Sequence, residues 1–171
     1  MSHEPGSIIR PDPVALFLTW TTYGSWLPGD SRGWVDRRGG VQVANRFVEQ
    51  AARRQMVMRP ITLTSLQRGV VARSIAAHCR FRGWTLHACQ CRTQHVHVVL
   101  TAVDSSASTA MSELKAWGTR ALDTHEERRS VSKSWRWWAK GGSGRLLFDQ
   151  RSLEDVAIYV RDCQERPRQN E

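Results

Sequence analysis

Two imidazoles stand one residue apart in the pattern His95-Val96-His97, within a run of β-branched and apolar residues. Alternate side chains of a β-strand lie on the same face. His95 and His97 are therefore expected to point one way, and Val96 and Val98 the other way. Two imidazoles at this spacing can bind one metal ion, although the same pattern also suits two polar residues on a half-exposed strand.

A tyrosine lies late in the chain, in a segment with helical periodicity. On a helix, Leu153, Val156, Ala157 and Val160 form one apolar stripe. Tyr159 falls about 60° from Val156, at the border of that stripe. A border position packs the aromatic ring and leaves the hydroxyl accessible, as in a nucleophile or in an ordinary amphipathic tyrosine.

These candidate residues need elements that position them. Residues 84–92 and 95–103 are strand-like and are joined by the short link 93–94, which predicts an antiparallel hairpin. Strands are also predicted over 14–22 and around 145–148, the latter after a glycine-rich turn at 141–144.

Three helices complete the pattern. The first, 64–82, has Leu66, Val70, Ala77 and Phe81 at helical spacing and ends at Gly83. The second is capped by residues 104–106 and runs to about 124. The third begins at 152–155, which matches a capping pattern, and runs to about 165.

The resulting order is strand, helix, strand, strand, helix, strand, helix. It predicts an α+β fold with a ferredoxin-like antiparallel sheet, helices packed on one face and a C-terminal helix that carries Tyr159. We expect a flexible tail over 1–13, a single domain over 14–166 and a second tail over 167–171. Within the domain, residues 23–60 form an insertion with a long loop and a short basic helix at 45–59.

The composition favours a polyanionic partner. Lys and Arg total 25 against 16 Asp and Glu, so the net charge is +9, and arginine is well suited to phosphate. Eight tryptophans can stack on unpaired bases or fill the core. The four cysteines lack the paired spacing of a zinc site. Without an apolar span or signal-like start, we expect a cytoplasmic protein.

Taken together, these features resemble the single-tyrosine HUH transposases, in which HUH denotes histidine, bulky hydrophobe, histidine. The REP-associated tyrosine transposases are a close branch. The resemblance extends from about residue 16 to 164. It is carried by the segments LTWTTYGSWLPGD, RGWTLHACQCRTQHVHVVL and AIYVRDCQ.

The resemblance implies a metal-dependent enzyme that cleaves and rejoins single-stranded DNA. It implies that His95 and His97 hold a divalent ion, Mg²⁺ or Mn²⁺, and that Tyr159 attacks a phosphodiester to leave a 5′-phosphotyrosine and a free 3′-hydroxyl. Joining then needs no nucleotide cofactor, because the covalent bond conserves the phosphoester energy. The implied partner is a hairpin or element-end DNA. A homodimer, with the tyrosine helix serving the partner's histidines, stays open.

One position departs from the family pattern. The family places a third polar ligand on the tyrosine helix, about one turn after the tyrosine. Here that position is Cys163, a poor ligand for a hard ion. Gln164 is our first choice, with Asp155 and Asp162 as alternatives. The Asn-Asn-Pro sequence common in the REP-associated branch is replaced by RDCQERP.

Basic residues near the two tryptophan clusters are the DNA-binding candidates. Each could be a solvated surface charge, but together they would set the affinity and its salt dependence. They are Arg32, Arg37, Arg38, Arg136, Lys140 and Arg145.

Two other functions fit the sequence less well. A histidine-triad nucleotide hydrolase needs a third alternate histidine, and Val99 occupies that position. A domesticated, non-catalytic DNA-binding protein would not need His95, His97 and Tyr159 together. The transposase reading is therefore preferred.

Overall fold

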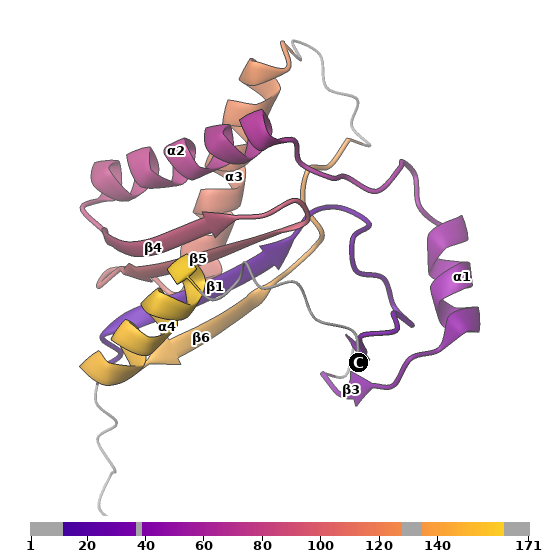
Figure 1. Cartoon of the computed structure of the whole chain (residues 1–171), viewed down its shortest axis with the longest axis horizontal. Coiled ribbons are helices and arrows are strands. Elements are labelled where there is room, and N and C mark those ends of the chain that lie inside the picture. The colour runs from indigo at the N-terminus through magenta and orange to yellow at the C-terminus, as the bar shows by residue number, and fades with distance from the viewer. Residues whose placement is uncertain (1–11, 37–38, 128–134, 163–171) are drawn as a thin grey trace, which may run out of the picture.

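A computed structural model describes residues 12–36, 39–127 and 135–162. Its main sheet is antiparallel, with strand order β4-β5-β1-β6 (Figure 1). The strands are β1 (Ala15–Thr21), β4 (Thr85–Cys91), β5 (His95–Thr101) and β6 (Ser143–Leu147). The predicted α+β fold class and the order of its elements are confirmed.

Helices cover both faces of this sheet. α2 (Ser65–Arg82) and α3 (Ala107–His125) pack on one face, and α4 (Gln150–Asp162) lies on the other (Figure 1). The core under α2 and α3 contains Leu18, Trp20 and Val98 from the strands and Ile75 and Leu114 from the helices. None of the helices within the described residues has the length and apolar character needed to cross a bilayer.

The face under α4 is lined by small and branched residues. Leu153, Ala157 and Val160 pack there in one buried cluster with sheet residues Ala88 and Val99. Ala15 and Leu147 belong to the same cluster. The predicted apolar stripe of the last helix is thus confirmed, and Ala157, which faces the small side chains of the sheet, allows the helix backbone to approach closely.

Two predicted boundaries are wrong. β6 begins at Ser143, so half of the predicted turn at 141–144 belongs to the strand. α4 begins at Gln150 rather than Ser152. The reason is Asp149, whose carboxylate accepts hydrogen bonds from both the backbone N–H and the hydroxyl of Ser152, at 2.8 and 2.7 Å, and so caps the helix earlier. The expected end near 165 lies outside the described residues.

The inner face of α2 also differs from the pattern in the sequence. Leu66 and Phe81 are exposed at 73% and 80%, whereas Ile75 and His78 are buried. His78 can be buried because its Nε2 lies 2.8 Å from a carboxylate oxygen of Glu113 on α3. A polar residue with a partner from another helix therefore replaces the expected apolar contact.

The insertion, residues 23–60, forms an arm beside the end of the sheet (Figure 1). It contains a small hairpin, β2 (Trp34–Val35) with β3 (Val41–Gln42), which the sequence did not predict. It also contains a helix in the predicted place, α1 (Arg46–Arg54), which is capped by Asn45 and ends at Arg54 rather than at the predicted residue 59. No residue of α1 is buried, so the arm is held mainly by its loops.

Candidate functional site

His95 and His97 share one face of β5, as the alternation predicts. Their ring centroids are 4.7 Å apart, whereas Val96 and Val98 are fully buried in the core on the other side. His97 lies on the face that carries α4, because Val99, next on the same face, belongs to the cluster under that helix. The metal-binding role of the two imidazoles stays a prediction.

The ring of His97 is held by two residues of the neighbouring strand. Thr19 pairs with His97 in the sheet register, and its Oγ1 lies 3.0 Å from Nδ1 of the imidazole. The ring of Phe17 stacks against the same imidazole, with the two ring centroids 5.9 Å apart. When Nδ1–H donates to the threonine hydroxyl, Nε2 keeps its lone pair and is free to bind an ion.

Both imidazoles are held in the neutral form at neutral pH. Burial is the largest cause that lowers the pKa of His97, to about 4. The electrostatic influence of His95 and then of Arg92 adds to it. Burial, and then Arg92 and Arg32, also lower the pKa of His95. Neutral imidazoles are the form that binds transition metals, while the nearby guanidinium groups favour a phosphate over the site.

This donor set fits Mn²⁺, or Mg²⁺ with further oxygen ligands, but it is incomplete within the described residues. No group of three His, Cys, Asp or Glu side chains comes together in that part of the chain. Asp155 and Asp162 are exposed on α4. Cys163 and the preferred third ligand, Gln164, lie outside the described residues, so the choice among these four stays open.

Tyr159 lies on α4 at the edge of its buried stripe, as predicted. Its side chain is 49% exposed, while the next residue, Val160, is fully buried. The half-exposed residue therefore lies on a helix that is fixed to the sheet, and the role of Tyr159 as a nucleophile stays a prediction.

The direction of Tyr159 follows from the two flanks of α4. One flank, with Ile158 and Arg161, lines a cavity of about 340 Å³ together with His87. His87 bonds to Thr101, at the end of β5 farthest from His95. Helical spacing places Tyr159 on the other flank, so it is turned away from the His87 end of the sheet.

A groove of about 440 Å³ lies beside the histidines, between β1 and the arm. Thr19 belongs to its lining and also contacts His97. Two predicted DNA-binding residues, Arg32 and Lys140, line the groove together with Trp26 and Trp34. The structure thus brings the arm's tryptophans to a groove that also contains Thr19, the hydrogen-bonding partner of His97, which no spacing in the sequence indicates.

The role of Arg32 differs from a simple phosphate ligand. Its Nε and Nη2 donate to the carboxylate of Asp30, at 2.7 and 2.6 Å, and Nη2 also donates to the carbonyl oxygen of Ser25 at 2.8 Å. The guanidinium beside Asp30 holds the pKa of that carboxyl below its usual range. Much of the donor capacity of Arg32 is therefore used inside the arm.

The other predicted DNA-binding residues are distributed differently. Arg145 pairs with Phe17 across β1 and β6, so it shares the face of His97 and is exposed. Arg136 lines a separate cavity of about 340 Å³, which Lys140 also lines. Arg37 and Arg38 lie outside the described residues.

Two basic residues that the sequence analysis missed lie on the other side of His95. Arg68, in the first turns of α2, and Arg92, at the end of the β4–β5 hairpin, line a cavity of about 520 Å³. Arg92 is close enough to lower the pKa of both imidazoles. The sequence could have indicated Arg92, because it lies three residues before His95. The place of Arg68 in this cavity depends on how α2 packs, which the sequence does not indicate.

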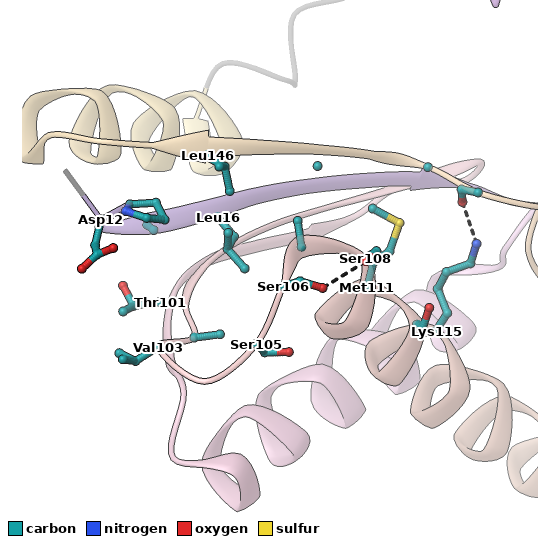
Figure 2. Close-up of a pocket in the computed structure, with 18 residues that line it drawn as sticks. Asp12, Leu16, Thr101, Val103, Ser105, Ser106, Ser108, Met111, Lys115 and Leu146 are labelled. Atoms are coloured by element: carbon teal, nitrogen blue, oxygen red, sulfur yellow. Dashed lines mark hydrogen bonds between the residues drawn. The ribbon is translucent and has the colours of Figure 1, made fainter. Parts of the chain in front are cut away.

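A larger cavity, about 920 Å³, lies away from this chemistry. Figure 2 shows Leu16 and Leu146 pointing into it from the strands, opposite Ser106 and Met111. Its one lysine, Lys115, donates to the carbonyl oxygens of Ala139 and Gly141 at 2.8 and 2.7 Å. The cation therefore holds the segment before β6.

Comparison with protein-family models and with curated proteins finds no match. Solved structures that are similar to this chain include the following two. One is a REP-associated tyrosine transposase bound to a REP hairpin, with 15% identity, a TM-score of 0.49, and coverage of 94% of this chain and 70% of that one. The other is a "putative transposase" from Deinococcus radiodurans, with 12% identity, a TM-score of 0.48, and coverage of 94% and 95%.

Proposed function

We propose that this protein is a metal-dependent transposase that cleaves single-stranded DNA and transfers the strand through a 5′-phosphotyrosine on Tyr159. The observation that carries the proposal is the pair of neutral imidazoles, His95 and His97, on the sheet face that also docks the tyrosine helix. The basic groove and cavity on either side of them supply contacts for a DNA backbone.

In the proposed reaction the oxygen of Tyr159 forms a bond to phosphorus, and the bond from phosphorus to the 3′-oxygen breaks. The phenol loses its proton, and the departing oxygen takes one up to become a 3′-hydroxyl. The reverse step, with a 3′-hydroxyl attacking the phosphotyrosine, joins strands and restores the phenol. One phosphoester replaces another at each step, so no nucleotide cofactor is required.

His95 and His97 would hold Mg²⁺ or Mn²⁺, which polarises the scissile phosphate and stabilises its developing charge. Thr19 and Phe17 keep the ring of His97 in place. The charge of Arg92, near His95, would attract the DNA phosphates. Val99, in the position that a histidine-triad hydrolase gives to a histidine, is fully buried under α4, which disfavours that alternative.

Covalent trapping tests the proposal. A single-stranded oligonucleotide with a hairpin is labelled at its 3′ end and incubated with protein and Mn²⁺. A 5′-phosphotyrosine transfers this label to the protein in a denaturation-resistant adduct, whereas a 5′ label leaves on the released fragment that ends in the new 3′-hydroxyl. The adduct should vanish in Tyr159→Phe.

Tyr23→Phe is the matched control, because Tyr23 is the chain's other tyrosine. Its hydroxyl accepts a hydrogen bond from the backbone N–H of Val57, at 3.2 Å, so this variant should still form the adduct. Specific DNA binding without an adduct, across several metals and hairpins, would instead identify a non-catalytic binding protein.

A further inference from the structure

We propose that the groove between β1 and the arm binds one unpaired nucleobase of the DNA strand, stacked on Trp26 and Trp34, with the adjoining phosphate on Lys140. The inference rests on the proposed function and adds to it the subsite that selects single strands. Its volume, about 440 Å³, falls within the range of small-molecule sites.

Trp26 and Trp34, two of the three tryptophans that line the groove, have their indole N–H bonded within the arm. The indole N–H of Trp26 donates to the carbonyl oxygen of Gly33 at 2.7 Å, and that of Trp34 donates to Val43 at 3.2 Å. These bonds restrict rotation of the rings. Because Trp26 is nevertheless 45% exposed, its aromatic surface is available for stacking without reorganisation.

Arg32 is a positioning residue in this subsite. Its guanidinium lies 4.6 Å from the centre of the Trp26 ring and is fixed there by the buried Asp30. The contact holds the indole from one side. Gly29 adds rigidity, because it has a φ of +89° and a side chain there would collide with the backbone of Asn45 and Glu49.

The remaining walls supply the polar contacts that a nucleotide needs. Lys140 is exposed at the rim, and Gly141 and Gly142 beside it present only backbone. Thr19, Thr21 and Ser143 contribute hydroxyls. Hydroxyls and a mobile ammonium impose no single hydrogen-bond pattern, so stacking dominates and the subsite should accept different bases.

The subsite is placed next to the proposed chemistry. Thr19 lines the groove and contacts His97, so a base in the groove belongs to a nucleotide adjacent to the scissile phosphate. A base paired within a duplex is stacked on its neighbours and cannot enter. The groove would therefore require the strand to be unpaired at the cleavage position.

Binding measurements separate the contribution of the base from that of the backbone. The Tyr159→Phe protein is titrated in EDTA with a fluorescent dT20 strand and with an abasic strand of the same length. Neither cleavage nor a metal is involved, so the result is independent of the trapping experiment. We expect Trp26→Ala and Trp34→Ala each to weaken binding of dT20 by about tenfold, the effect of losing one stacked base.

The same variants should bind the abasic strand as tightly as the parent protein. Trp34→Phe should restore most of the affinity for dT20, which excludes simple misfolding of the arm. Trp117→Ala is the matched control, because Trp117 is similarly exposed, at 42%, but lies on α3. The proposal is overturned if the parent does not distinguish the two strands, or if the variants lose affinity for both equally.

Discussion

Thr19 lies directly across the β1–β5 pair from His97, with its hydroxyl oxygen 3.0 Å from Nδ1 of the imidazole. Register alone creates this contact, because opposite residues in an antiparallel pair share a face. The hydroxyl hydrogen-bonds to Nδ1, so the other ring nitrogen, Nε2, is the one available to a metal. Such partners orient the imidazole and select its tautomer.

Thr19→Val should therefore weaken the metal site while leaving the strand intact. Valine has nearly the shape of threonine but cannot hydrogen-bond, so we expect a 10- to 100-fold increase in the Mn²⁺ concentration needed for half-maximal adduct formation, the usual range for such partners. Thr19→Ser keeps the hydroxyl and should behave nearly as the native protein. Equal metal requirements in the valine and serine variants would show that this contact has no bearing on the metal.

His97→Ala should abolish nicking and leave DNA affinity nearly unchanged. Arginine contacts to phosphate dominate binding, whereas the imidazole acts only on the reacting phosphate. Adduct yield and fluorescence anisotropy measure the two properties on one oligonucleotide. His87→Ala is the control. His87 lies on β4, beside the flank of α4 that faces away from Tyr159, and hydrogen-bonds to Thr101. Normal nicking by His97→Ala would remove the metal argument.

The acid stability of the metal-free protein should depend on His97. Its pKa is about 4 in the fold against an ordinary value of 6.5. Between these values the unfolded chain takes up a proton that the folded chain resists. The contribution of His97 to the free energy of unfolding should therefore be fully present above pH 6.5. The free energy of unfolding should decrease as the pH falls toward 4.

For a partly exposed ring we expect this loss to be roughly 1–2 kcal/mol, after allowance for solvent screening. Urea unfolding in EDTA at pH 7 and pH 4.5 measures it. His97→Gln, which has no proton to take up, should show a smaller loss over the same interval. Identical losses in the two proteins would contradict the assigned cause.

The cavity of Arg68 and Arg92 should bind DNA phosphate. Arg68→Gln and Arg92→Gln should each weaken binding of a single strand and reduce the slope of log affinity against log salt by about 0.7, the value for one lost contact. Arg80→Gln is the control, because Arg80 is exposed in the last turn of the same helix. An unchanged slope in both cavity variants would exclude this phosphate site.

Much of the fold could be predicted because local signals and tertiary structure agree. In β5 the alternation, and in α4 the apolar stripe, each mark one face as the more apolar. The buried face of both elements was therefore predicted correctly. α2 has apolar residues on several faces, and His78 faces inward because Glu113 and the ring of Trp117, both from another helix, contact it. Similarly, the pattern at 152–155 resembles a helix start, but Asp149 competes for the same N–H.

The candidate site was predictable only in part, for the same reason. His95, His97 and Tyr159 were chosen as candidates from their own spacing and the family resemblance, and their roles stay predictions. The groove, however, joins β1, the arm and the segment before β6, which come together only in the folded chain. Arg32 was identified by its charge, yet its bonds to Asp30 give it a structural function.

The close approach of α4 to the sheet is the feature on which Tyr159 most depends. Ala157, at 5% exposure, packs in the same cluster as Ala88 and Ala15, so Ala157→Leu should push the helix outward at a cost of about 1–3 kcal/mol. A displacement of about 1 Å can reduce a reaction about 100-fold. Adduct formation should therefore fall far more than DNA affinity, which depends on residues outside this cluster. Ile158→Leu, a substitution at the exposed neighbouring position, should leave both properties unchanged. If Ala157→Leu forms the adduct at the native rate while remaining folded, the contact between this helix and the sheet does not position the nucleophile.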